Sequence, residues 1–213
     1  MRLLGKWGFA ALPHAYRNLY GFPELPPSTN IKALGMSPDE PEVPLLSHRH
    51  VGRTSDLKAF LSARTRPIKI VARVNVFARD EREEGAGLAR EHLESREAEL
   101  VLVRMPYKIA EGDWASGEIP RRCGPPHTSV APDEAFDDMA LYVKHSRGLV
   151  ALTSCGHAGV ENIMEYGLQV AGTDKLYATI GGRTRACRGY SLHWHCGYRN
   201  APSGFTNCGV VES

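Results

Sequence analysis

Two apolar segments separated by a short amphipathic one restrict the fold of this chain more than any other feature. VPLLSH at 43–48 has the composition of a buried strand, and IKIVARVNVF at 68–77 is rich in the β-branched residues that favour strands. Between them, LKAFLSA at 57–63 spaces its apolar residues as one face of a helix does. Together they predict a β-loop-α-β unit, which is typical of a layered α/β domain.

The same alternation continues toward the C-terminus. A segment of helical period predicts a helix that ends at Gly172, where a glycine suits the end of a helix. The highly charged segment 78–99 predicts a solvated loop or an exposed helix. The segment 100–120 predicts short strands around a turn at 111–113, which indicates an antiparallel sheet. Further strands are predicted at 139–144, 148–154 and 175–182.

The composition is that of an ordinary globular protein and indicates no strongly charged partner. Apolar residues make up 42% of the 213 and charged residues 23%, and 26 basic against 24 acidic side chains leave a formal charge of +2. So small a charge predicts neither nucleic acid nor an anionic membrane as a partner. No apolar run could span a bilayer, and Lys6 and Pro13 interrupt the only leader-like stretch, so we expect a cytoplasmic protein. Five cysteines, an odd number, argue against a disulfide framework.

Two loops carry side chains that can bind a metal. His48 and His50 follow a predicted strand, where two imidazoles at i and i+2 can converge on one ion; the alternative is a surface pair. Cys155 and His157 lie where a predicted strand turns into a helix, and the alternative there is a buried cysteine in a capping turn. A third candidate is Asp138 with the aspartate before it, for which the alternative is a solvated turn.

Four stretches of the chain form a recognisable series: LLSHRHVGRTSDLKAFL, PYKIAEGDWASGEIPR, DDMALYVKHSRGLVALTSCGHAGVENIMEYG and KLYATIGG. Taken with their order and spacing, they resemble metallo-β-lactamase-fold hydrolases. Within that group the chain is similar to the branch of proteins like 7,8-dihydropterin-6-methyl-4-(β-D-ribofuranosyl)aminobenzene-5'-phosphate synthase. The resemblance implies an αββα sandwich with a metal site at the ends of the sheets, where a bound ion lowers the pKa of an attacking water.

The first loop of the family reads H-x-H-x-D-H, and this chain matches only its first half. His48 and His50 match the pair that binds one ion, whereas Gly52 and Arg53 stand where the Asp and the last His bind the other. We therefore expect no more than one ion, zinc or alternatively iron or manganese. The guanidinium of Arg53 is expected to line the site and to hold an anion such as phosphate.

The resemblance also implies roles for two residues of the second loop. His157 matches the histidine of the family turn Cys-Ser-His-Ala-Gly, which makes it the third expected ligand after His48 and His50. Cys155 falls near the position where other branches carry a bridging Asp, so it is expected to line the site, as is Asp138.

Both ends of the chain depart from the family, so we expect three regions. The Pro-rich segment 1–29 lacks the Phe-Asp-Thr-Gly-like turn of the family, and the metallo-β-lactamase-like domain is expected at 30–182, as an incomplete sandwich. The segment 183–213 has no helical or strand period. One inserted base in a suitable coding sequence would restore Gly-Thr-His-Thr-Gly-Leu there, so we hypothesise a frameshifted tail. The alternative is a genuine tail in which His193, His195 and Cys196 bind zinc.

These patterns leave three hypotheses for the function. The first is a metal-dependent hydrolase whose metal-activated water attacks a small-molecule ester, lactone or phosphate ester. The second is a degenerate, non-catalytic relative that binds one metal or an anionic ligand, which Gly52 and Arg53 favour. The third is a fragment with little stable structure, since missing strands leave sheet edges exposed. No catalytic side chain and no oligomeric state are assigned.

Overall fold

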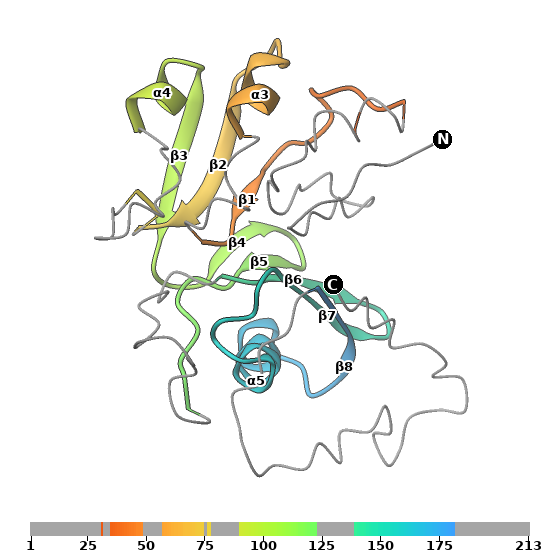
Figure 1. Cartoon of the computed structure of the whole chain (residues 1–213). Coiled ribbons are helices and arrows are strands. Elements are labelled where there is room, and N and C mark those ends of the chain that lie inside the picture. Colours follow the sequence, from red (N-terminus) through yellow and green to blue (C-terminus); the bar gives the residue numbers. More distant parts are fainter. Residues whose placement is uncertain are drawn as a thin grey trace.

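A computed structural model gives the fold and describes part of the chain (Figure 1). The described residues are 31, 35–48, 57–74, 76–77, 90–122 and 139–181. The predictions made for the segments 1–29 and 183–213 therefore lie outside the described residues.

The first sheet has three parallel strands in the order β1-β2-β3. Helix α3 connects β1 to β2, so the predicted β-loop-α-β unit is present, and a second helix, α4, precedes β3. The β-branched residues of β2 occupy the centre of this sheet, where both faces are covered and an apolar strand is favoured. The bounds are β1 Leu45–Leu46, α3 Leu57–Ser62, β2 Ile68–Arg73, α4 Arg90–Glu94 and β3 Ala98–Val103.

The second sheet has five strands in the order β4-β5-β6-β7-β8. Its first four strands pair antiparallel, and short turns connect β4 to β5 and β6 to β7. Strand β7 pairs parallel with β8 after the chain crosses through helix α5. The bounds are β4 Tyr107–Ala110, β5 Asp113–Ala115, β6 Leu141–His145, β7 Gly148–Thr153, α5 Val160–Ala171 and β8 Leu176–Gly181.

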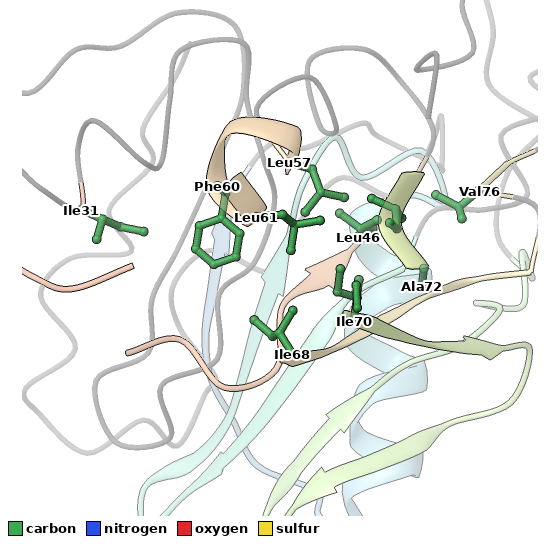
Figure 2. Packing of buried hydrophobic residues seen from close by; sticks show 11 residues of the cluster. Ile31, Leu46, Leu57, Phe60, Leu61, Ile68, Ile70, Ala72 and Val76 are labelled. Carbon is green, nitrogen blue, oxygen red and sulfur yellow. The ribbon is translucent and has the colours of Figure 1, made fainter. Parts of the chain in front are cut away.

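Three apolar clusters show that the elements form four layers. One cluster packs α3 and α4 on the first sheet, and Figure 2 shows Phe60 and Leu61 of α3 directed toward Ile68 and Ile70 of β2. A second cluster joins the two sheets, with members such as Val71 from the first and others from the second. The third packs α5 on the second sheet. This arrangement is an αββα sandwich, as expected, because each sheet buries one face against its partner and the other against helices.

Alternation of side chains along the strands explains how each sheet serves two cores. In β6, Leu141 faces the other sheet, whereas Tyr142 faces α5. The phenol of Tyr142 is fully buried and donates a hydrogen bond to the Ile163 carbonyl of α5 at 2.7 Å. Gly167 of α5 lies directly over this ring, since a Cβ there would come within 2.6 Å of Tyr142 Cε1. The helix therefore packs close to the sheet only because residue 167 lacks a side chain.

Most elements lie where the sequence predicts them, with three differences. The segment 78–99 was predicted as a solvated loop or an exposed helix, but Leu93 of α4 is fully buried in the core on the first sheet and Ala98 begins β3. The helix predicted to end at Gly172 does so, with that glycine in the left-handed conformation at φ 58°. The antiparallel prediction for 100–120 is confirmed for β4 and β5 but is wrong for β3, which pairs parallel with β2. Strand β2 also ends before Phe77, because the Val76 amide turns back to donate to the Arg73 carbonyl at 3.0 Å. In the described part of the chain, every helix is too short or too polar to cross a membrane.

Candidate metal centre

Three side chains that can bind a metal lie together at one end of the sandwich. His48 lies two residues beyond the end of β1, and Cys155 and His157 follow β7. One ligand atom from each of these three side chains lies within 4.8 Å of the other two. The rings of His48 and His157 are 5.0 Å apart between centroids and are inclined at 79°. The first sheet thus supplies one histidine and the second sheet supplies the other two groups.

The strand end before His48 holds this imidazole in a fixed orientation. Its Nδ1 atom is 2.9 Å from the Ser47 hydroxyl, and both side chains are fully buried. Histidines that bind metals commonly use one ring nitrogen for the ion and the other for a hydrogen bond that orients the ring. In His48 the Ser47 hydroxyl occupies Nδ1, so Nε2 is the nitrogen available in this arrangement for an ion.

The turn that carries Cys155 and His157 is held by glycines. Gly156 and Gly159 have φ values of 69° and 89°, which side-chain-bearing residues rarely adopt. The amide of Gly159 donates to the Gly156 carbonyl at 2.8 Å, and the carbonyl of Gly159 accepts the Ile163 amide of α5 at 3.0 Å. The chain therefore reverses within a few residues between β7 and α5, and this tight turn presents the thiol and the imidazole at the end of the sheet.

The donor set fits a transition metal, and zinc best. Imidazole nitrogen and thiolate sulfur are the ligands that zinc binds in proteins, whereas magnesium and calcium prefer oxygen. Bonds of about 2.1 Å to nitrogen and about 2.3 Å to sulfur place the ligand atoms of one zinc ion roughly 3.6 Å apart. The three ligand atoms lie within 4.8 Å of one another, so a movement of about 1 Å or less would bring them to this spacing. Cys155, which we expected only to line the site, is therefore positioned as a candidate ligand.

The remaining site residues named from the sequence lie outside the described residues. His50, the second expected ligand, is one of these, and so are Gly52, Arg53 and Asp138. The limit of one ion and the anion site at Arg53 both depend on this loop, and they stay predictions. Of the expected residues, the structure brings together His48, His157 and Cys155.

An ion pair that no sequence motif predicts lies at the same end of the sandwich. Arg73, the last residue of β2, is 1% exposed, and its Nη2 atom is 3.2 Å from Oε2 of Glu118. A signal for it was present, because Arg73 alternates with Ala72 and so lies on the same face of β2 as Val71, which faces the second sheet. A charged residue on that face, at the end of a strand beside the metal-binding loop, needs a partner in the interior.

Comparison with known proteins finds two relatives, both from Methanocaldococcus jannaschii. No protein-family model matches the chain. The 7,8-dihydropterin-6-methyl-4-(β-D-ribofuranosyl)-aminobenzene-5'-phosphate synthase of Methanocaldococcus jannaschii is 25% identical over 174 residues, which are 72% of this chain and 59% of that protein. An uncharacterized protein of the same organism is 30% identical over 96 residues, or 41% of this chain and 34% of that protein. The chain thus spans less than two thirds of the length of either relative.

Solved structures agree with the layers described above. A metal-dependent hydrolase of the β-lactamase superfamily matches with a TM-score of 0.64 over 83% of this chain and 69% of that chain, at 24% identity. A quorum-quenching N-acyl homoserine lactone lactonase matches with a TM-score of 0.50 over 85% of this chain and 82% of that chain, at 17% identity. The chain therefore has the metallo-β-lactamase fold, as its resemblance to that group of metal-dependent hydrolases implied.

Proposed function

We propose that the protein is a metal-dependent hydrolase that uses one zinc ion to cleave an ester, a lactone or a phosphate ester. The observation that carries the proposal is that ligand atoms of His48, from the first sheet, and of Cys155 and His157, from the second, lie within 4.8 Å of one another. His50 is the fourth candidate ligand, on the strength of the sequence alone. Iron and manganese remain the alternatives to zinc, but a sulfur ligand favours zinc among these metals.

The residues of the chain would bind and orient the ion. When bound, zinc supplies a Lewis acid and lowers the pKa of a water molecule toward neutrality. Ser47 would fix the His48 ring, because its hydroxyl engages Nδ1 at 2.9 Å. The buried position of both side chains would keep bulk water from competing for the ligand nitrogen. No general base is assigned within the described residues.

The substrate class is proposed from the relatives together with the sequence. The name of the Methanocaldococcus jannaschii synthase, which is 25% identical to this chain, includes a pterin and a phosphate ester. A phosphate ester is therefore the first class to test, and lactones are the second. Because the chain spans 59% of the length of that relative, the activity of the whole relative is a proposal here.

Elemental analysis together with a substrate screen tests this proposal. The protein would be dialysed against metal-free buffer, analysed for zinc, iron and manganese, and assayed with aryl phosphate esters and aliphatic lactones. We expect one zinc per chain and a zinc-dependent activity on one class, both lost in the double variant His48→Ala/His157→Ala. The exposed His145, at the opposite end of the second sheet, gives the control His145→Ala. Two ions per chain, or an activity that survives the double variant, would contradict the proposal.

A second candidate function rests on the sequence of the first loop. Gly52 and Arg53 stand at two positions where the family binds its second ion, so a non-catalytic relative that binds one metal or an anion is the alternative. This alternative predicts that the protein binds one zinc ion per chain but turns over no ester. It also predicts that the protein binds phosphate and that Arg53→Ala weakens this binding. Calorimetric titration with phosphate, in the presence and absence of zinc, separates the two functions.

A further inference from the structure

The buried arginine of the first sheet lies beside the strand that carries His48. Leu46 of β1 pairs with Ala72 of β2, so the next residues along the two parallel strands, Ser47 and Arg73, are neighbours. Arg73 pairs on its other side with Val103 of β3. Its side chain is 1% exposed and lies on the face that packs against the second sheet, like Val71. A positive charge is thus buried between the sheets at the end where the candidate ligands meet.

The acidic partner comes from the other sheet and is itself anchored to both. Glu118 follows β5, and two hydrogen bonds hold the intervening Ser116 to Ala140, the residue before β6. The Ser116 amide donates to the Ala140 carbonyl at 2.9 Å, and the Ala140 amide donates to the Ser116 hydroxyl at 3.0 Å. The Glu118 amide donates at 2.7 Å to the carbonyl of Arg104, the residue after β3. This short segment therefore passes from the second sheet to the end of the first, where its carboxylate reaches Arg73 at 3.2 Å.

The segment before Glu118 packs tightly against the end of β3, which fixes the backbone from which the Glu118 side chain extends. Gly117 has a φ of 64°, and a Cβ at this residue would lie 2.5 Å from the Arg104 carbonyl oxygen and from the backbone of Met105. The backbone of the segment is thus pressed against the end of β3 directly before Glu118. An ion pair held on both sides by backbone hydrogen bonds is better ordered than one between two flexible surface side chains.

We propose that the Arg73–Glu118 ion pair positions the candidate metal ligands by holding the two sheets together at this end of the sandwich. His48 comes from the first sheet, and His157 and Cys155 come from the second, so their separation depends on how the sheets are spaced there. Arg73 is next to the residue that precedes His48, and Glu118 lies on the segment that leaves β5 of the second sheet. Neither side chain needs to touch the ion, and both act through the ligands. The inference rests on the proposed metal site.

The test measures zinc affinity and ligand geometry rather than turnover alone. Zinc affinity of the full chain would be measured by competition with a chromophoric chelator, and the ligand geometry by the absorption spectrum after cobalt substitution. Residues that orient metal ligands typically change affinity by about 10-fold to 100-fold when they are replaced, so we expect Glu118→Gln to weaken zinc binding about 10-fold. We also expect it to shift the cobalt bands, because the ligands no longer meet at the same angles.

Two further variants keep the test decisive. Glu111→Gln removes the carboxylate of an exposed ion pair with Lys108 at the opposite end of the second sheet, and it should leave zinc affinity and the cobalt spectrum unchanged. Arg73→Lys keeps the charge but loses the planar fork, and it should weaken zinc binding as Glu118→Gln does. If Arg73→Lys does not fold, Glu118→Gln decides, because the Glu118 side chain is 48% exposed and its replacement buries no new group.

The outcomes separate this inference from the proposed function. A wild-type chain that binds no zinc overturns the proposed function, and the positioning role with it. A wild-type chain that binds zinc, together with a Glu118→Gln variant of equal affinity and unchanged cobalt spectrum, overturns the positioning role alone. Weaker binding in Glu118→Gln with full affinity in Glu111→Gln supports it.

Discussion

The two ends of the second sheet carry polar side chains in opposite environments. At the end formed by the β6–β7 hairpin, His145 and Arg147 are exposed, and both contact Tyr177 of β8. The His145 ring stacks on the Tyr177 ring at 5.5 Å, and the Arg147 guanidinium lies 5.6 Å from the same ring. At the end that follows β7, Thr153 and Ser154 are 1% and 0% exposed. Polar groups are thus placed in water at one end and in the interior at the other.

The difference indicates which end has a function that depends on exact geometry. Exposed polar contacts contribute little to stability, because water can replace each partner. Burying a polar group costs free energy unless other groups compensate, so a cluster of buried polar side chains is kept where it serves structure or chemistry. In this chain the buried cluster adjoins His48, Cys155 and His157. Substitutions of the same kind at the two ends should therefore have very different effects.

The largest effect is expected from histidines. His48→Ala should weaken zinc binding by more than about 100-fold, since it removes a ligand rather than a group that orients one. His145→Ala, at the hairpin end, removes an exposed imidazole and should leave zinc affinity as in the wild type. Chelator competition on the two purified variants provides the measurement. Equal losses of zinc affinity in both variants would show that the two ends do not differ in zinc binding.

The next effect compares two glycines with positive φ. Gly117→Ala, at the metal end, should reduce the free energy of unfolding by about 3 kcal/mol, because the new Cβ meets backbone atoms in a strained conformation. Gly112→Ala, in the β4–β5 turn at the hairpin end, should reduce it by only about 1 kcal/mol, since the atoms nearest to its Cβ are 3.6 Å away. Urea titration followed by circular dichroism gives both values. A larger loss for Gly112→Ala would reverse the comparison.

The smallest effect is expected at an exposed ion pair. The Lys108 ammonium, 2.5 Å from Glu111, holds the pKa of that carboxyl below its ordinary value by a hydrogen bond and by its charge. A lowered pKa in the folded state means that the pair stabilises the fold above the ordinary carboxyl pKa and loses this contribution as pH falls through the lowered value. The difference in unfolding midpoint between wild type and Glu111→Gln should thus be small at pH 7 and vanish in acid. Thermal scans from pH 7 to pH 3 check this, and a difference that grows in acid would contradict it.

The sequence predicted regular elements well where a local pattern specifies them. The end of α5 at Gly172 follows from a glycine after an amphipathic segment, and both the glycine and its left-handed conformation are found. The partner of β3 was predicted wrongly, because a strand of alternating and β-branched residues fits a parallel or an antiparallel neighbour equally well. Only the tertiary packing of α4 and β2 places β3 in the first sheet.

The candidate site was predicted only in part, because local motifs identify some of its residues and tertiary packing brings in the others. His48 and His157 were identified through short motifs, each of which is local in the chain. Arg73 and Glu118 belong to no motif, and their contact depends on two sheets packing at a given distance. Neither residue type nor spacing along the chain encodes that distance. Contacts between the sheets are therefore where sequence-based inference ended and the structure added most.

The division of the candidate ligands between the two sheets also has a consequence for folding and for the lifetime of the folded protein. An ion held jointly by His48, from the first half of the chain, and His157, from the second, has its full site only after both sheets have formed and docked. Zinc would therefore bind the folded chain and not the unfolded one, and each tenfold rise in free zinc above the dissociation constant would add about 1.4 kcal/mol to the free energy of unfolding. If docking of the sheets is completed late in folding, the ion would act mainly on the rate of unfolding. The lifetime of the folded protein would then follow the zinc supply around it.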